Sequence, residues 1–358
     1  MLEVKIGKSA ILPEGLLLGH AQDEAAATGC TVILCPEGGL GAVAVRGAAP
    51  ATRETDLLAP ENTVEVVHAV LLSGGSAFGL DAATGIMRYL ESQNIGFALA
   101  DVVVPIVVGA SIFDLDVGSA TVRPDANMGY NAAAQATAEI GETGNVGAGT
   151  GACVGRFMGP DAAMKGGLGI ASVQSAGLLV TAVVAVNSLG NIYDRKLGSY
   201  IAGAHLPVQP VATKAGQAEA QGSTVSVGLG GTSQKAEATL IVEPLEILPD
   251  LMMAMATQQT NTTIGVVATN AILTKPLALR VASMAHDGMA RAIYPAHTSF
   301  DGDALFTLAT GKVPAHPDVV GALAALAVEQ AILDAVLSAK SAYGFAAVSS
   351  FAGENLTI

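Results

Sequence analysis

Apolar runs of strand length, set between stretches with helical spacing, limit the folds open to this chain. Residues 178–186 form a continuous run typical of a buried strand, which ends at Asn187, and residues 64–72 form another, mostly apolar run. The second run stops at a Ser-Gly-Gly turn at 73–75, after which apolar residues recur at helical spacing. Such runs are typical of strands buried in a sheet that helices cover. A layered α/β sandwich is therefore the predicted architecture.

The rest of the chain continues this alternation. Strands are expected at residues 31–34, 43–45, 101–112, 238–242, 264–268 and 346–349, and helices near 131–140, at 248–257, from Pro276 onward and at 319–339. Residues 203–235 are rich in Gln, Gly, Ser and Thr, which predicts the most loop-like part of the chain.

One glycine-rich motif is excluded as a nucleotide site. Residues 147–152, Gly-Ala-Gly-Thr-Gly-Ala, formally match a dinucleotide-binding fingerprint with Ala in the place of the third glycine. No hydrophobic strand precedes the motif, and no acidic residue lies about 20 positions beyond it to hold a ribose. A dinucleotide site is therefore not predicted.

The charge balance bears on partners. The 358 residues carry a formal net charge of −14, from 31 acidic and 17 basic residues, and contain no run of Lys or Arg. Nucleic acid is therefore not an expected partner. Charged residues make up only 13% of the chain and apolar residues 51%, which predicts that part of the exterior is buried against other subunits.

The cysteines and the N-terminus bear on location. Cys30, Cys35 and Cys153 are an odd set without CxxC spacing, which favours buried, reduced thiols over a disulfide framework. Residues 1–5 lack the apolar core of a signal peptide, and no stretch is expected to span a membrane. We expect a cytoplasmic protein without a membrane partner.

The stretch that carries most chemistry is Asn261-Thr262-Thr263, where a short polar run meets a predicted strand. If the peptide bond before Thr262 were cut, its hydroxyl would be a nucleophile and its freed α-amine the base. An α-amine has an ordinary pKa of about 7.7–8.0, so it can accept the hydroxyl proton near neutral pH. The same residues also fit a polar loop that opens a β-branched strand, and spacing does not decide between the two.

Several motifs, in the same order over nearly the whole chain, resemble one known family. They lie at residues 73–80, 147–151, 164–167 (Met-Lys-Gly-Gly), 261–269 and 297–303, the last containing His-Thr followed by Asp-Gly-Asp. The family is that of the self-cleaving aminopeptidases, which includes the L-aminopeptidase/D-esterase, the β-peptidyl aminopeptidases and the nylon-oligomer hydrolase. Each motif alone is weak, and jointly they are specific.

The resemblance implies a fold and a cut. The fold would be a four-layer αββα sandwich of the N-terminal-nucleophile hydrolase type. The precursor would cut itself between Asn261 and Thr262, giving a large chain 1–261 and a small chain 262–358 that stay together in one intertwined domain. The nylon-oligomer hydrolase also has Asn-Thr at its cut.

The resemblance also implies roles for single residues. Thr262 would be the nucleophile, and the Asn187 amide would stabilise the tetrahedral oxyanion. Asp301 and Asp303 match the acidic pair near the nucleophile, where a carboxylate would raise the basicity of the new amine. Read without the family, Asn187 also fits a cap of the turn after its strand, and the acidic pair a solvated turn.

Two residues compete for the role of the site's cation. The nylon-oligomer hydrolase has a catalytic Lys where this chain places Arg156, whereas Lys165 falls where the peptidases carry Lys-Gly-Gly. An Arg cannot donate a proton at neutral pH, so the role of Arg156 would be electrostatic. A structural ion pair is the alternative for both residues.

Three further residues are assigned to the substrate pocket, namely Phe78, Phe113 and Asp114, although phenylalanines at such places also fit a core. His297 is expected to be packed or hydrogen-bonded rather than to act as a base.

The sequence therefore predicts an autoprocessing amide hydrolase that acts on short peptides or small linear amides and esters. It would work without a cofactor or metal, as a homo-oligomer of four or more cleaved units. Three alternatives stay open: an endo-type hydrolase of linear 6-aminohexanoate oligomers, an acyltransferase of the ornithine acetyltransferase type, and an uncleaved binding protein without catalysis.

Overall fold

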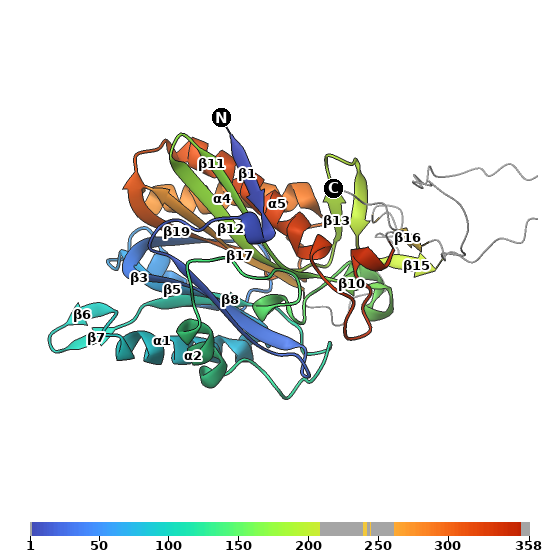
Figure 1. Ribbon diagram of the computed structural model, residues 1–358, viewed down its shortest axis with the longest axis horizontal. Helices are drawn as coiled ribbons and strands as arrows, with labels where there is room; N and C mark the ends of the chain where they lie inside the picture. The colour runs from blue at the N-terminus through green and yellow to red at the C-terminus, as the bar shows by residue number, and fades with distance from the viewer. Residues whose placement is uncertain (1, 208–238, 242–243, 245–260, 352–358) are drawn as a thin grey trace, which may run out of the picture.

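Two sheet layers lie between two pairs of helices in the computed structural model, which describes residues 2–207, 239–241, 244 and 261–351 (Figure 1). One helix pair, α4 and α5, lies at the top of Figure 1, and the other, α1 and α2, lies at the bottom. The bounds of the helices are α1 Ala82–Ser92, α2 Ala126–Ala134, α4 Lys275–Ala292 and α5 Pro317–Leu337. The predicted four-layer αββα sandwich is confirmed.

Ten strands of the described chain form one sheet that runs through both layers. Its order is β1-β11-β12-β17-β19-β3-β5-β8-β4, with β2 paired to β3. The bounds of its strands are β1 Glu3–Ile6, β2 Leu17–Asp23, β3 Thr28–Val45, β4 Thr52–Arg53, β5 Val66–Ser73, β8 Val107–Ser111, β11 Gly167–Ser175, β12 Leu178–Asn187, β17 Thr262–Ala271 and β19 Ala304–Val313. The smaller sheets are formed by β6 Phe97–Leu99 with β7 Val102–Val104, β9 Cys153–Val154 with β10 Met164–Lys165, β13 Asn191–Asp194 with β14 Ser199–Ala202 and β18 Ile293–Tyr294, and β15 His205–Pro207 with β16 Thr239–Ile241.

The long strand β3 joins the two layers. Its first part pairs with β2 and β5, and its last part pairs with β19. Its register against β5 shifts between Leu34 and Gly39, and a bulge of this kind bends a strand. The strands predicted at 31–34 and 43–45 are therefore two parts of one strand of 18 residues.

Three apolar cores separate the four layers, and the strand period distributes residues among them. On β12, Val183 lies in the core between the sheet layers, whereas Val184 lies in the core beneath α4 and α5. On β5, Val70 faces the core between the layers and Leu71 faces α1 and α2. Both faces of these strands are buried, which is why their sequences are mostly apolar. The predictions of strands at 64–72, 178–186 and 264–268 are confirmed.

The prediction of one continuous strand at 101–112 is wrong. The structure has two strands there, β7 and β8, separated at Pro105. Proline has no N–H to donate to a ladder, so one continuous paired strand is not available. Instead β7 folds back on β6 as a hairpin that projects beyond α1 in Figure 1.

Two further predictions need correction. The helix expected near 131–140 begins at Ala126, because the Asp125 carboxylate caps it by accepting the Met128 N–H at 2.8 Å. It ends at Ala134, and Thr137 then bridges to the edge of β2. The strand expected at 346–349 is only an isolated bridge, since the Ala347 N–H donates to the Ser341 hydroxyl rather than to a neighbouring strand.

The long helix α5 bears on the membrane prediction. Its length and mean hydropathy would fit a membrane span, but 78% of that window is buried inside the fold, as in a core helix. Three of the sequence-based predictions fall wholly or partly outside the described residues. They are the helix at 248–257, the two ends of the strand at 238–242, and most of the loop at 203–235, from residue 208 onward.

Close packing between β11 and α5 should make one glycine essential to stability. A Cβ at Gly169 would lie 1.8 Å from the Ala331 carbonyl oxygen. We expect Gly169→Ala to lower the free energy of unfolding by about 1–3 kcal/mol or more, because backbone must shift to admit the methyl group. The control is Gly141→Ala, whose Cβ would meet nothing within 4 Å. Urea unfolding that shows equal stability for both variants would contradict this packing.

Candidate active site

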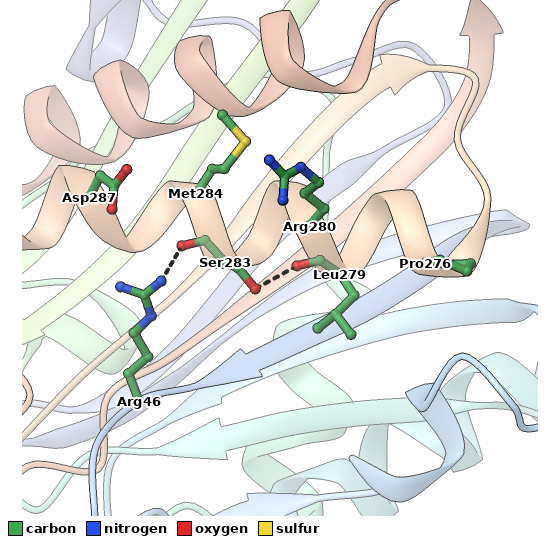
Figure 2. A pocket seen from close by; sticks show the side chains of 7 residues that line it. All are labelled: Arg46, Pro276, Leu279, Arg280, Ser283, Met284 and Asp287. Atoms are coloured by element: carbon green, nitrogen blue, oxygen red, sulfur yellow. Dashed lines mark hydrogen bonds between the residues drawn. The ribbon is translucent and has the colours of Figure 1, made fainter.

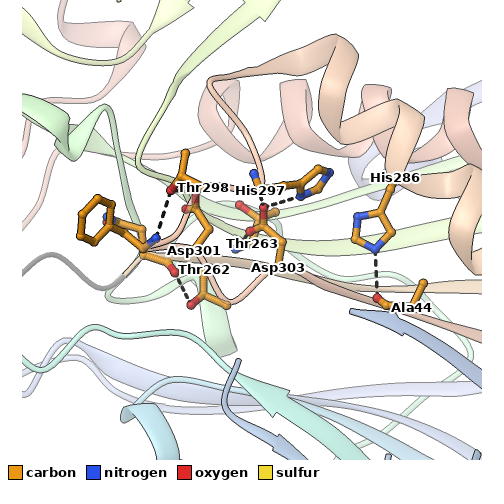
Figure 3. A network of polar contacts seen from close by, with 10 residues as sticks. Ala44, Thr262, Thr263, His286, His297, Thr298, Asp301 and Asp303 are labelled. Atoms are coloured by element: carbon orange, nitrogen blue, oxygen red, sulfur yellow. Dashed lines mark hydrogen bonds and ion pairs between the residues drawn. The ribbon is translucent and has the colours of Figure 1, made fainter. Parts of the chain in front are cut away.

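Thr262, the first residue of β17, lies beside the turn that carries Asp301 and Asp303 (Figure 3). It pairs with Asn187, the last residue of β12, and only 4% of it is exposed. Its hydroxyl donates a hydrogen bond to the carbonyl oxygen of Asn261. The nucleophile predicted from the sequence therefore lies against the peptide bond that it is predicted to cut.

The turn before β19 holds Asn261 by its backbone. The Asn261 N–H donates to the Phe300 carbonyl at 3.0 Å, and the Gly302 N–H donates to the Asn261 carbonyl at 2.9 Å. A Cβ at Gly302 would lie 2.8 Å from the Thr262 hydroxyl oxygen, so the turn passes very close to the nucleophile. The Asn261 carbonyl oxygen thus accepts two donors, one from the backbone and one from the candidate nucleophile.

The two predicted carboxylates flank this turn, and both are buried. Asp303 accepts the Thr263 N–H at 2.7 Å through Oδ1, so it holds the start of β17. Asp301 accepts the backbone N–H of Thr298 at 2.9 Å and its hydroxyl at 2.5 Å. Burial, and after it the charge of Asp303, raises the pKa of Asp301 to about 6. The solvated-turn alternative is therefore wrong, because both carboxylates are enclosed.

The segment after β3 fixes the same turn from the other side. The N–H groups of Arg46 and Gly47 donate to the Asp303 carbonyl at 2.9 and 3.1 Å, and the Ala49 N–H donates to the Asp301 carbonyl at 2.9 Å. A Cβ at Gly47 would lie 2.2 Å from the Asp303 nitrogen. The segment at 46–49 can therefore approach the backbone of Asp303 this closely only with a glycine at position 47.

Asn187 is fully buried, and its amide joins three segments. Its Oδ1 accepts the Cys153 N–H at 2.9 Å, and its Nδ2 donates to the Phe113 carbonyl at 2.9 Å. A side-chain amide nitrogen carries two hydrogens, so one Nδ2 hydrogen remains beyond the contact with Phe113. This geometry is compatible with the predicted oxyanion role, which stays a prediction.

The two candidate cations have different surroundings. The buried Lys165 ammonium donates to the carbonyls of Gly149, Ala152 and Gly166 at 2.7–3.1 Å, which uses all three of its hydrogens. Burial lowers the pKa of Lys165 to about 8. These contacts support a structural role for Lys165, by which it holds the glycine-rich segment after residue 147.

Arg156 forms an ion pair with Asp116, and the Arg156 side chain is only 7% exposed whereas that of Asp116 is 43% exposed. Among the described residues Nη1 of Arg156 has no hydrogen-bond partner. A structural ion pair was the sequence-based alternative for Arg156, and it is present. The catalytic roles proposed for Arg156 and Lys165 both stay predictions.

The residues assigned to the substrate pocket differ in exposure, since Phe78 is exposed and Asp114 is buried. Phe78 is 59% exposed and lies beneath the Arg123 guanidinium, 3.7 Å from the ring centroid. Asp114 is buried, and its carboxylate accepts the Gly75 N–H and the Thr28 hydroxyl, both at 2.7 Å. Burial raises the pKa of Asp114 to about 6. Asp114 thus supports the turn after β5 in this structure, and its contact with substrate is an untested prediction.

Sequence reasoning missed several groups around the nucleophile. It did not assign the Gly302 N–H, the Thr298 hydroxyl or the Asp116 carboxylate. The spacing of Asp301-Gly302-Asp303 after His297-Thr298 was the available signal, but a backbone donor has no side-chain signature.

Two surface hollows lie away from these residues. The first, of about 400 Å³, is a groove along α4 (Figure 2), and it is lined by Arg46, Pro276, Leu279, Arg280, Ser283, Met284 and Asp287. The second, of about 390 Å³, lies beside β2 and α2. Neither is lined by a predicted site residue. Within the described ranges, no group of three His, Cys, Asp or Glu residues is arranged to hold a metal ion.

The chain is similar to known peptidases and amide hydrolases over nearly its whole length. The model of peptidase family S58 matches residues 10–349 of the chain. The chain is 41% identical over 334 residues to an uncharacterized aminopeptidase of Mycobacterium tuberculosis, covering 89% of this chain and 88% of that protein. It is 29% identical over 341 residues to a 6-aminohexanoate-oligomer endohydrolase of Kocuria sp., covering 90% and 84%.

A solved structure shares the fold. The L-aminopeptidase D-Ala-esterase/amidase of Ochrobactrum anthropi, a variant of the Ntn hydrolase fold, superimposes with a TM-score of 0.61 at 16% sequence identity. The match covers 95% of this chain and 90% of that one. The fold class predicted from the sequence is therefore confirmed.

The raised pKa of Asp301 predicts a pH-dependent contribution to stability. Because its folded-state pKa lies above the ordinary value, the contribution is present below about pH 4 and is lost as pH rises through about 6. We expect the stability of the native carboxyl relative to Asp301→Asn to fall by about 2–3 kcal/mol between pH 4 and pH 7. Urea unfolding should be measured with Thr262→Val in both proteins, so that each is a single chain. An unchanged difference across this range would refute the assignment.

Proposed function

The chain belongs to peptidase family S58, and from this premise we propose that Thr262 becomes its N-terminal nucleophile by self-cleavage. The chain is a hydrolase of peptide-type bonds, as its family and its aminopeptidase relatives indicate. The observation that carries the proposal is the pair of donors on the Asn261 carbonyl oxygen, which are the Gly302 N–H and the Thr262 hydroxyl.

This arrangement supports a two-step cut. The Thr262 oxygen attacks the Asn261 carbonyl carbon, and the Gly302 N–H stabilises the negative charge that develops on the carbonyl oxygen. The C–N bond then breaks, and the proton lost by the hydroxyl goes to the departing amine. An ester between Asn261 and Thr262 remains, and water hydrolyses it to the Asn261 carboxylate and a free Thr262 hydroxyl. The products are chains 1–261 and 262–358.

The new amine would serve as the base in turnover. An α-amine has an ordinary pKa of about 7.7–8.0, and the buried carboxylates of the adjacent turn, Asp301 and Asp303, would favour its ammonium form. Thr262 attacks the substrate carbonyl, an acyl-enzyme forms on its oxygen, and the leaving amine takes the proton from the α-ammonium. Water then releases the acyl group. The second Nδ2 hydrogen of Asn187 would bind the oxyanion, and the loss of such a donor typically costs about 2.7–4 kcal/mol of barrier.

The substrates we propose are short peptides and small linear amides or esters. An endo-type action on linear 6-aminohexanoate oligomers is the second candidate, supported by the relative from Kocuria sp. whose name states that activity. Product length separates the two: release of single end units from an oligomer indicates an exo action, and internal fragments indicate an endo action. The family match favours hydrolysis over acyl transfer.

Assembly and location are also proposals. The weakly charged composition supports burial of part of the exterior against other subunits, and we propose a homo-oligomer of four or more cleaved units. The three cysteines are free and buried, which supports a reducing, cytoplasmic location.

The nucleophile can be tested with matched hydroxyl deletions. Thr262→Val keeps the β-branched shape and removes only the nucleophile, so we expect an uncut chain whose amide hydrolysis falls about 1,000-fold or more. Thr262→Ser should still be cut. Thr307→Val is the control, because the Thr307 hydroxyl is buried on β19 without a partner among the described residues. Denaturing mass spectrometry and hydrolysis of amino-acid nitroanilides give the readout. A cut and active Thr262→Val protein would rule out the mechanism.

A further inference from the structure

His297 makes an unusual approach to one of the two carboxylates. It lies between β18 and β19 with φ of +58°, a left-handed conformation that residues with a side chain rarely adopt. From there its backbone N–H lies 3.1 Å from Asp303 Oδ2, and its ring Nδ1 lies 2.8 Å from the same oxygen. A strained backbone of this kind persists only where the surrounding contacts enforce it.

The two oxygens of Asp303 have separate partners. Oδ2 receives both groups of His297, and Oδ1 receives the Thr263 N–H. An ionised carboxylate only accepts hydrogen bonds, so ring Nδ1 is assigned as the donor. His297 and β17 are thus linked through a single buried carboxylate, one residue away from Thr262.

A second histidine closes the far side of the ring (Figure 3). His286 of α4 packs edge-on against His297 with ring centroids 4.8 Å apart, and its Nε2 lies 2.9 Å from the Ala44 carbonyl oxygen. Burial lowers the pKa of His286 to about 4, so His286 is neutral near neutral pH. The His297 ring is therefore packed against His286 on one side and hydrogen-bonded to the Asp303 carboxylate on the other.

We propose that His297 is a positioning residue for the nucleophile: it locks the Asp303 carboxylate against the start of β17 and so orients the Thr262 hydroxyl and amine. The inference rests on the proposed role of Thr262. His297 does not touch the reacting atoms and acts only through Asp303. Without the ring, the Asp303 carboxylate loses the Nδ1 contact at Oδ2. It then keeps only the backbone N–H groups of His297 and Thr263, so it holds the start of β17 less firmly.

The expected signature follows from this indirect role. Misplacement of a nucleophile by about 1 Å can slow a reaction about 100-fold. Because His297 reaches Thr262 only through Asp303, we expect KM to change little while kcat and the rate of self-cleavage fall. A residue that only packs would lower stability without this separation of kcat from KM.

Two substitutions separate the ring's hydrogen bond from the backbone strain. Both Gly and Asn tolerate a left-handed φ, so His297→Gly and His297→Asn should both fold. Asn places its side-chain nitrogen as many bonds from the backbone as Nδ1 of His, and can donate to Asp303, whereas Gly cannot. We expect His297→Gly to slow self-cleavage and kcat about 10- to 100-fold, and His297→Asn to stay within about threefold of the native protein.

The control is Asn94→Gly, at an exposed position with φ of +59° after α1. The two His297 variants differ by Asn against Gly, and Asn94→Gly makes that same change away from the site. We expect it to leave kcat and the rate of self-cleavage unchanged. The fraction folded, measured by urea unfolding, normalises every rate. Equal rates of self-cleavage and equal kcat for His297→Gly and His297→Asn would overturn the positioning role. A loss of activity that comes from a higher KM alone would overturn it as well.

The test also separates this inference from the proposed function. If Thr262→Val is cut and active, the nucleophile is wrong and the inference falls with it. If Thr262→Val is uncut and inactive while His297→Gly matches the native protein, Thr262 stands and only the role of His297 is refuted.

Discussion

The backbone contact between the turn at 300–303 and residues 261–263 is the constraint on which the site depends. β17 and β19 are parallel neighbours with Ile264 opposite Ala304, so the residues that precede them lie at the same edge of the sheet. Three hydrogen bonds connect the two segments there, two through the backbone of Asn261 and one from the Thr263 N–H to Asp303. The position of the candidate nucleophile therefore follows from strand pairing rather than from a flexible loop.

Buried polar groups form a second layer around this contact. The Lys165 ammonium binds three carbonyls of the glycine-rich region, and Asn187 ties the end of β12 to the segments at Cys153 and Phe113. Burying such groups without partners would cost free energy, so each must be satisfied by a defined neighbour. This requirement fixes the loops that surround Thr262. At Gly47 and Gly302 the backbone of a neighbouring segment lies too close to admit a side chain.

The sequence predicted the layers better than it predicted the groups that surround Thr262. Strands buried on both faces leave a continuous apolar signal, which is why β5, β12 and β17 were found near their observed bounds. The hairpin β6–β7 was missed because its exposed apolar side chains resemble a buried strand, and α2 was displaced because the Asp125 cap was overlooked. The Gly302 N–H and the contact of His297 with Asp303 depend on tertiary folding, so no local pattern could predict them.

The most direct test of this account is denaturing mass spectrometry of the freshly purified native protein, with N-terminal sequencing of each fragment. The account predicts two chains, residues 1–261 and 262–358, with the smaller one beginning Thr262-Thr263-Ile264. A chain that remains whole on prolonged incubation would contradict it. A cut at any other bond would contradict it equally, because the free α-amine would then not belong to Thr262.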